Sequence, residues 1–419
     1  MKKETLSPET RMLHAPYATA DAYNALNMPV YHAVAYEFDT AAQMELAFTG
    51  KTTEPVYSRI TNPTVQYFEQ RVQALTGAAE VISFNSGMAA IANTLMAVAS
   101  SGTNIVTSPH LFGNTYSLIA FTLKDFGVEP RFCNLTDMDD VKAHVDENTC
   151  AVFLEVITNP QMEVASLRAL SALCKERGVP LIADTTIVPF TVFKAAAFGA
   201  DIEVVSSTKY ISGGATSLGG LVIDYGTFDW QQSRKLRPLV GVSNLPAFST
   251  KIRREIHRNL GACMTPHVAH VQTMGLETLD LRYQRAAATC KALAERVGAL
   301  NGVVSVNYPG LQGHPYYAVS REQFGETPGA MFTFDVLSRE AAFSFIDHLQ
   351  LIRRATNLFD NKSLAIHPAS TIFGTFTEEL RRSMDISQCT LRISVGLEDI
   401  DDLYDDIKQA LYRAKRVNH

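Results

Sequence analysis

Residues 204–214 read Val204-Val205-Ser206-Ser207-Thr208-Lys209-Tyr210-Ile211-Ser212-Gly213-Gly214: a β-branched run, a cluster of hydroxyls, one lysine and a small-residue loop. An apolar strand that delivers a single amine beside hydroxyl donors suits an aldehyde cofactor that carries a phosphate. The Lys209 amine can form a Schiff base, the hydroxyls of Ser206 and Thr208 can bond phosphate oxygens, and the glycines let the backbone come close. The same sequence is compatible with a strand followed by a turn that carries a solvated lysine. At this point both a cofactor-binding lysine and a solvated one remain possible.

A second segment, Val179-Pro180-Leu181-Ile182-Ala183-Asp184-Thr185-Thr186, narrows the choice. Its short apolar run predicts a buried parallel strand that ends in the Asp184 carboxylate, where open α/β sheets hold their ligands. Pyridoxal phosphate needs an ionised acid beside its ring nitrogen, because the protonated ring is the electron sink for a substrate carbanion. Asp184 alone could be a helix N-cap or a strand-end acid. Asp184 and Lys209 on successive strand ends favour the cofactor, and Thr186 is included among its predicted contacts.

From Tyr57-Ser58-Arg59 to Leu391-Arg392-Ile393-Ser394-Val395-Gly396-Leu397-Glu398 the chain resembles the Cys/Met-metabolism family of pyridoxal-phosphate enzymes. The resemblance covers almost the whole chain. It implies the aspartate-aminotransferase-like fold (fold type I), pyridoxal 5'-phosphate as cofactor and an amino acid as substrate.

Composition agrees with a large globular enzyme. The 419 residues exceed one ordinary domain, 46% are hydrophobic and 19% are charged. A formal net charge of −6 gives no electrostatic reason to expect nucleic acid or an anionic membrane as a partner. The first residues lack the apolar stretch of a signal peptide, and no apolar run approaches the about 20 residues of a membrane span. Six scattered cysteines predict free thiols in a reducing cytoplasm rather than disulfides or a zinc site.

Alternation of short strands with helical patterns predicts an α/β fold with a mostly parallel, doubly wound sheet. We predict an N-terminal arm over residues 1–60, a pyridoxal-phosphate-binding α/β domain over 61–262 and a smaller α+β domain over 263–419, which begins with a long helical pattern from Val268 to Val297. The seven predicted strands are Glu80–Phe84, Asn104–Thr107, Glu129–Cys133, Ala151–Val156, Pro180–Ala183, Glu203–Ser206 and Gly220–Ile223.

Two further segments are candidates for holding the cofactor's phosphate. Ser86-Gly87-Met88 follows a predicted strand and opens a helical pattern, where free N–H groups and the helix dipole favour an anion; an ordinary serine N-cap is the alternative. The resemblance implies that the Gly87 and Met88 amides bind the phosphate. It also implies that Tyr57 and Arg59, which would otherwise be surface residues, cross a dimer interface to the neighbouring subunit's phosphate, and it suggests a tetramer built from two dimers.

Phe112 and Asn159 are candidates for the two sides of the cofactor ring. Phe112 keeps the stacking surface of the tyrosine usual in the family but lacks its hydroxyl, so any proton transfer falls to Lys209 or Tyr57; simple core packing is the alternative. Asn159 resembles the family residue near the cofactor's phenolic oxygen, although an asparagine before proline also suits a turn.

Arg392 stands in the alternating run 391–395, where it shares a strand face with Ser394. An arginine there is often a surface charge, but the family places one here for the substrate α-carboxylate, which the forked guanidinium suits. His267 and His270 stand three apart on a helical pattern. Because no third ligand is in register, we interpret them as ordinary helix histidines.

The segment Asn357-Leu358-Phe359-Asp360-Asn361-Lys362-Ser363 discriminates best between substrates. Relatives that make or cleave cystathionine usually have a glutamate at the position of Lys362, which would hold the distal ammonium that a lysine repels. Asn357 with Lys362 resembles the O-acetylhomoserine sulfhydrylases, whereas Phe112 is a trait of the O-succinylhomoserine enzymes. Asn357 is predicted to share the carboxylate with Arg392, and Lys362 and Ser363 to lie at the substrate; a solvated loop charge is the alternative for Lys362.

The predicted reaction is a γ-replacement in which sulfide or methanethiol displaces acetate and gives homocysteine or methionine. A methionine γ-lyase, an O-succinylhomoserine sulfhydrylase or a cystathionine γ-synthase or lyase would use the same residues. Two other classes are a nucleotide-binding α/β protein, for which residues 212–220 lack the Gly-rich phosphate-loop patterns, and an inactive scaffold, which the presence of Asp184, Lys209 and Arg392 disfavours.

Overall fold

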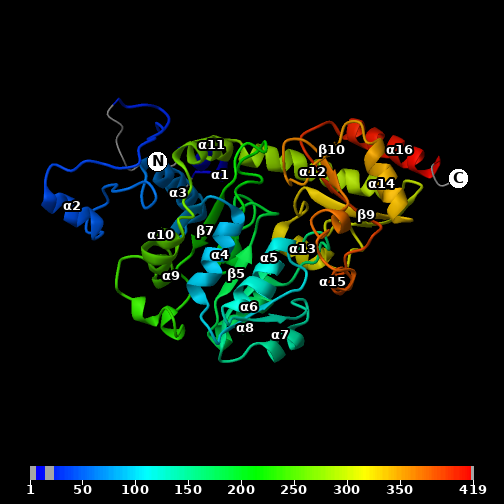
Figure 1. The fold of residues 1–419 in the computed structure, drawn as a ribbon. Helices are drawn as coiled ribbons and strands as arrows, with labels where there is room; N and C mark the ends of the chain where they lie inside the picture. The colour runs from blue at the N-terminus through cyan, green and yellow to red at the C-terminus, as the bar shows by residue number, and fades with distance from the viewer. Residues whose placement is uncertain (1–5, 15–22, 417–419) are drawn as a thin grey trace.

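A computed structural model describes residues 6–14 and 23–416, which form two β-sheets with helices around them (Figure 1). The larger sheet has seven strands in the order β1-β7-β6-β5-β4-β2-β3. Strand β7 runs antiparallel to β1 and β6, and the remaining neighbours are parallel, so the predicted mostly parallel sheet is confirmed. Its strands are β1 (Glu80–Phe84), β2 (Asn104–Thr107), β3 (Glu129–Phe132), β4 (Thr149–Glu155), β5 (Leu181–Asp184), β6 (Ile202–Val205) and β7 (Gly220–Asp224), each within two residues of the prediction.

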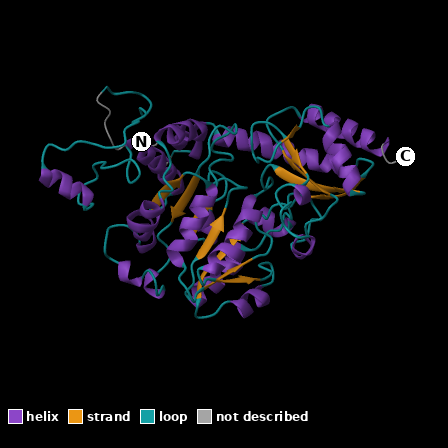
Figure 2. Ribbon diagram, in the orientation of Figure 1, coloured by secondary structure: helices purple, strands orange, loops and turns teal. Residues whose placement is uncertain are grey.

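Both faces of this sheet are buried under helices, as Figure 2 shows. Successive residues of a strand point to opposite faces, and in β5 Leu181 and Ala183 join one apolar cluster while Ile182 joins another. This double burial explains why inner strands such as β4 and β5 are mostly apolar, whereas the edge strand β3 (Glu-Pro-Arg-Phe) is not.

The second sheet lies in the C-terminal part of the chain and has the order β10-β11-β12-β9-β8. It is antiparallel except for the pair β10 and β11. Helix α16 (Ile400–Arg416) packs against α12 (Leu279–Gly298) and α14 (Arg339–His348); α12 packs against β8 and β9, and α14 against β9. Arg392 lies on its β12, opposite Thr333 of β9. The strands are β8 (Val303–Asn307), β9 (Met331–Val336), β10 (Arg353–Arg354), β11 (Leu364–Ile366) and β12 (Thr390–Ser394).

The helical pattern from Val268 to Val297 is two helices rather than one. Thr278 separates α11 from α12 with φ −114° and ψ 6°, and its hydroxyl accepts a hydrogen bond from Arg282 Nε at 3.1 Å. The α-helices are α1 (Pro8–His14), α2 (Ala41–Phe48), α3 (Pro63–Thr76), α4 (Gly87–Val98), α5 (Gly113–Ser117), α6 (Leu123–Asp125), α7 (Met138–His144), α8 (Leu167–Arg177), α9 (Ala247–Lys251), α10 (His257–Leu260), α11 (Pro266–Glu277), α12 (Leu279–Gly298), α13 (Tyr317–Phe324), α14 (Arg339–His348), α15 (Glu378–Ser383) and α16 (Ile400–Arg416).

The N-terminal region has two parts. Helix α1 packs on α3 and α11, whereas α2 stands away from the body at the end of an extended stretch, the blue helix at the far left of Figure 1. Met44 and Phe48 of α2 are 46% and 49% exposed, and Leu26 is 99% exposed. Apolar side chains held this far from the core of their own chain suit a surface that another protein covers.

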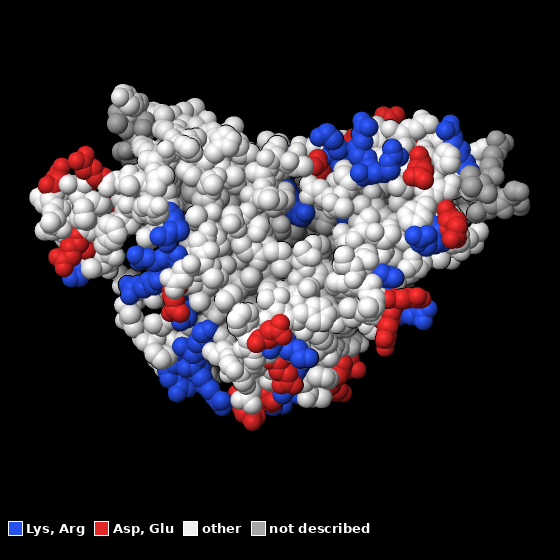
Figure 3. Space-filling view, viewed as in Figure 1, with Lys and Arg blue, Asp and Glu red and all other residues white. Residues whose placement is uncertain are grey.

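Charged groups of both signs lie around the edge of the face in Figure 3, and its centre carries few of them. Among the described residues, no helix combines the length and the apolar character that crossing a membrane requires.

Candidate active site

Lys209 follows β6 on a tight turn, in which its N–H donates to Ser206 O at 3.2 Å and its carbonyl accepts from Gly213 N at 3.1 Å. Its Nζ donates to Asn357 Oδ1 at 2.8 Å, so the structure brings together two predicted residues that are far apart in the sequence. Burial, and secondly the nearby charge of Arg392, lower the pKa of Lys209 to about 8. A lysine with such a pKa can lose and regain a proton near neutral pH.

Asp184 ends β5 and lies opposite Glu155, the last residue of the neighbouring β4. Its Oδ1 accepts from the backbone N–H of Thr186 at 2.9 Å and from the Thr186 hydroxyl at 2.6 Å. Burial raises the pKa of both carboxyl groups, and the charge of Asp184 raises that of Glu155 further. A cation brought into this site would therefore be strongly favoured.

The start of α4 lies against the end of β6. Ser86 caps the helix, because its hydroxyl accepts a hydrogen bond from Ala89 N at 3.1 Å. The N–H groups of Gly87 and Met88, in the same first turn, have no acceptor within the helix. A Cβ on Gly87 would lie 2.6 Å from Ser206 Cβ, so only glycine lets the two segments approach this closely. Thr208 Oγ1 bonds the backbone of Gly219, accepting from its N–H at 3.0 Å. The predicted phosphate-binding residues of this chain thus lie on neighbouring elements.

Arg392 is one of the largest fully buried side chains, with 2% exposure. Its guanidinium donates to Asn159 Oδ1 at 3.1 Å and to Thr356 O at 3.2 Å, and its Nε has no partner among the described residues. Burial lowers its pKa to about 9, with no carboxylate to offset that cost. A buried cation with only neutral partners is costly unless a ligand supplies the anion.

Phe112 is half-buried at the start of α5, where its N–H donates to Glu155 Oε1 at 2.6 Å. That bond ties the loop with the predicted stacking ring to the carboxylate pair at the ends of β4 and β5.

The loop after β10 presents its residues in three different ways. Asn357 faces Lys209, as described above. Lys362 is exposed, and its N–H donates to Asp360 Oδ1 at 3.1 Å. Ser363 is fully buried; its hydroxyl donates to Glu398 Oε2 at 2.8 Å and accepts from Gly396 N at 2.9 Å. The single hydroxyl hydrogen of Ser363 is thus donated to Glu398, which follows β12 in the chain, and the contact between Ser363 and substrate stays a prediction.

Tyr57 and Arg59 lie on the exposed base of the arm. Tyr57 is 37% exposed, the Arg59 guanidinium lies 5.4 Å from its ring centroid, and Arg59 donates to Arg258 O at 2.8 Å. No contact of either residue with Lys209 or Asp184 is present within the described part of the chain, so the structure does not bring them together with the other predicted site residues.

Comparison with known proteins identifies the family. The family model for Cys/Met metabolism PLP-dependent enzymes matches residues 9–412. The chain belongs to this family. It is 34% identical to O-acetyl-L-homoserine sulfhydrylase of Corynebacterium glutamicum, over 96% of this chain and 95% of that protein. It is 32% identical to L-methionine gamma-lyase of Pseudomonas putida, over 96% of each chain.

A solved structure from Campylobacter jejuni, which carries N'-pyridoxyl-lysine-5'-monophosphate at its position 205, has a TM-score of 0.91 and 32% identity. The match covers 97% of this chain and all of that one. The predicted family, fold type and pyridoxal-phosphate dependence are therefore confirmed for this Cys/Met-metabolism enzyme.

The sequence analysis missed Glu155, which is buried in this chain and pairs with Asp184 across β4 and β5. The signal was present, because Glu155 is the penultimate residue of the predicted strand Ala151–Val156, and Asp184 directly follows the next predicted strand. Arg282 was missed as well: it donates to Tyr210 O, at 2.5 Å, and to Gly275 O, at 2.6 Å, which braces the segment after Lys209. No local pattern announces that role, since it depends on how α12 packs.

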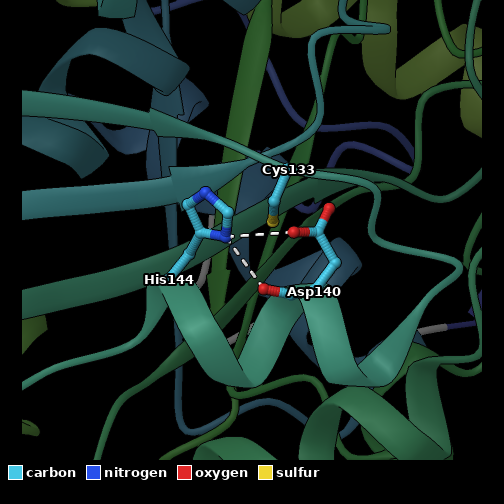
Figure 4. A group of neighbouring side chains, drawn as sticks. All are labelled: Cys133, Asp140 and His144. Atoms are coloured by element: carbon cyan, nitrogen blue, oxygen red, sulfur yellow. Dashed lines mark hydrogen bonds and ion pairs between the residues drawn. The ribbon is translucent and has the colours of Figure 1, made fainter.

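The described residues contain one group that resembles a metal site, made of Cys133, Asp140 and His144 (Figure 4). His144 Nδ1 lies 2.8 Å from the carbonyl of Asp140 and 3.3 Å from its carboxylate, so this nitrogen carries a hydrogen rather than a free lone pair. Burial raises the pKa of Cys133 to about 12, which keeps it a thiol. The closeness of Asp140 and His144 is thus explained by their hydrogen bond within α7, and the protonated Cys133 beside them is a poor metal ligand. His267 and His270 do not belong to any such group.

Proposed function

We propose that this protein is an O-acetylhomoserine sulfhydrylase, which replaces the acetate of O-acetylhomoserine with sulfide or methanethiol to give homocysteine or methionine. The observation that carries the proposal is the buried Arg392, which has no anionic partner among the described residues, in the same site as the amine of Lys209. Near full-length similarity to a sulfhydrylase supports the choice within the family.

The chain's residues fit the cofactor. Lys209 would carry it, Asp184 with Thr186 would keep its ring nitrogen protonated, and Phe112 and Asn159 would lie at the ring. Its phosphate would be held by Ser86, Gly87, Met88, Ser206 and Thr208, together with Tyr57 and Arg59 from the partner. The close approach of Gly87 to Ser206, which a Cβ would prevent, supports this cradle. Bound pyridoxal phosphate supplies an electron sink for carbanions at Cα and Cβ of the substrate.

Arg392 would bind the substrate α-carboxylate through two parallel N–H donors. Asn159 and the carbonyl of Thr356 hold the guanidinium in place. Asn357 accepts from Lys209 through its side chain, so the same loop would orient both the carboxylate and the amine that moves protons. We propose that Ser363 braces this loop through Glu398 and that the exposed Lys362 disfavours substrates with a distal ammonium.

Lys209 Nζ would take the Cα proton and, once it has passed that proton on and is a neutral amine again, a Cβ proton, because its pKa of about 8 lets it lose and regain a proton near neutral pH. Acetate then leaves from Cγ, sulfide or methanethiol adds at the same carbon, and the two protons return. Phe112 has no hydroxyl to share this work, so Lys209 and the partner's Tyr57 are the candidates for it.

The proposed assembly is a dimer at minimum, and a tetramer of two dimers is the expected form. The arm of residues 1–60 would complete the neighbouring site, next to domains over 61–262 and 263–419. The exposed Tyr57, Arg59 and apolar side chains of α2 support this division. Six free cysteines agree with the reducing cytoplasm that we propose as its location.

Mixing inactive Arg59→Ala and Lys209→Ala subunits tests shared sites. Hybrid dimers should contain one site with both natural residues and should recover part of the activity. Absence of recovery after subunit exchange has been verified by mass would refute shared sites.

The reaction is tested by offering the purified enzyme O-acetylhomoserine with sulfide, O-succinylhomoserine with sulfide, cystathionine and methionine in parallel. We expect homocysteine formation from the acetyl ester to be fastest. Faster keto-acid release from methionine would identify a γ-lyase instead. A preference for the succinyl ester would identify an O-succinylhomoserine sulfhydrylase, the activity with which Phe112 is associated.

A further inference from the structure

Phe359 has an unusual backbone conformation next to the site. Its φ is +55°, in the left-handed region that a bulky side chain rarely adopts, and its side chain is 2% exposed. Such strain persists only where surrounding contacts enforce it, and it occurs most often at functional sites.

Two contacts hold Phe359 in this conformation. Its ring stacks on Tyr210, with the centroids 4.3 Å apart and the planes at 10°. Its N–H donates to Ser394 Oγ at 2.7 Å, on the strand that carries Arg392. Tyr210 is itself fixed, because its hydroxyl accepts from Ala330 N at 2.9 Å and its ring meets Tyr283 edge-on at 5.3 Å.

These contacts join three segments that are distant in the sequence. Tyr210 directly follows Lys209, and Phe359 lies two residues after Asn357, which accepts from Lys209 Nζ at 2.8 Å. Asn361 N, two residues further on, donates to Gly213 O at 3.2 Å. The stack is an apolar contact between the loop that carries Asn357 and the turn that carries Lys209, and it lies between the two hydrogen bonds at Asn357 and Asn361.

We propose that Phe359 is a positioning residue, whose ring clamps the 357–363 loop onto the Lys209 turn and so keeps Asn357 against the lysine amine. The left-handed backbone conformation of Phe359 allows this, because it turns the side chain toward Tyr210 while the N–H still donates to Ser394. The proposal rests on the proposed function only in assigning the cofactor to Lys209.

The variant Phe359→Leu keeps an apolar side chain and removes the stack. Phe345→Leu is the matched control, since Phe345 is also fully buried and meets Phe334 edge-on in the C-terminal core. On the full-length holoenzyme, the pH dependence of the cofactor's visible absorbance and the kinetic constants are measured. On the cofactor-stripped full chain, the pKa of Lys209 is measured by competitive acylation and peptide mass spectrometry.

We expect Phe359→Leu to raise the Lys209 pKa by about one unit, because a loosened loop admits water and relieves the burial that lowers it. We also expect kcat to fall roughly 10- to 100-fold, with a smaller change in KM. Phe345→Leu should change thermal stability alone. Phe359→Gly, which accepts a positive φ without strain, should reproduce the pKa shift if Phe359→Leu folds poorly.

An unchanged Lys209 pKa and kcat in a folded Phe359→Leu protein would overturn the proposal, as would equal shifts in Phe345→Leu. Absence of a cofactor band in the unmutated enzyme would instead contradict the proposed function, while the acylation experiment would still test the clamp.

Discussion

Replacing Arg392 by methionine should lower activity without lowering stability, because the buried charge of Arg392 destabilises the folded protein but is proposed to bind the substrate carboxylate. Methionine fills much of the same volume and carries no charge. The two N–H bonds to a substrate carboxylate are charge-assisted and contribute about 1.5–3 kcal/mol each. Their loss should lower kcat/KM for O-acetylhomoserine by about 10²- to 10⁴-fold, at about 1.4 kcal/mol per tenfold change.

The same substitution should leave thermal stability almost unchanged. The lowering of the Arg392 pKa from 12.5 to about 9 means that burial penalises the charged form by about 5 kcal/mol, at about 1.4 kcal/mol per pH unit. Removing the charge relieves that penalty. Against it stand Asn159 Oδ1 and the Thr356 carbonyl, each of which loses a donor at a cost of about 1–3 kcal/mol. The two effects offset each other, and the melting temperature should shift by less than about 3 °C.

The assay compares O-acetylhomoserine with its α-carboxamide, in which the anion is missing. The unmutated enzyme should strongly prefer the carboxylate, and Arg392→Met should lose that preference. Arg339→Met, which removes an exposed cation from α14, is the control and should change neither rate. If Arg392→Met keeps kcat/KM within about threefold, or still prefers the carboxylate, the assigned role of Arg392 is wrong.

Three further predictions concern the cofactor. Gly87→Ala places a Cβ 2.6 Å from Ser206 Cβ, so the cradle must open; cofactor affinity should fall at least about tenfold by equilibrium dialysis, and unchanged affinity would contradict the phosphate site. Asp184→Asn should keep some cofactor by its visible absorbance yet lose most turnover, because a neutral amide cannot hold the ring nitrogen protonated; full turnover would contradict the electron-sink role. In the cofactor-free protein the Lys209 pKa is lowered from 10.5 to about 8. Between pH 8 and 10.5 this lysine is therefore protonated in the unfolded chain but mostly neutral in the folded one, so the free energy of unfolding rises with pH over this range. Lys209→Met should therefore be the more stable protein at pH 7 by calorimetry, and its advantage should shrink from pH 8 to 10; an advantage independent of pH would contradict the shift.

The sequence alone determined the parts of this protein that depend on local order. Alternation of short strand-like runs with helical patterns predicted all seven strands of the larger sheet, and inner strands such as β4 and β5 are mostly apolar because both of their faces are buried. Asp184 and Lys209 could be placed at one edge of that sheet, since the carboxyl ends of parallel strands meet there. Family and cofactor followed from the motifs around these two residues.

Tertiary structure alone decided how distant segments meet. Thr278 divides one helical pattern into two helices, and the sequence prediction missed this because threonine fits a helix interior well enough. Glu155 and Phe359 acquire their meaning only from partners that are brought in by other strands and loops. The hydrogen bond from the Ser363 hydroxyl to Glu398 depends on how the 357–363 loop packs against the segment that follows β12. Each of these outcomes is set by long-range contacts, whose geometry a local pattern of residues does not encode.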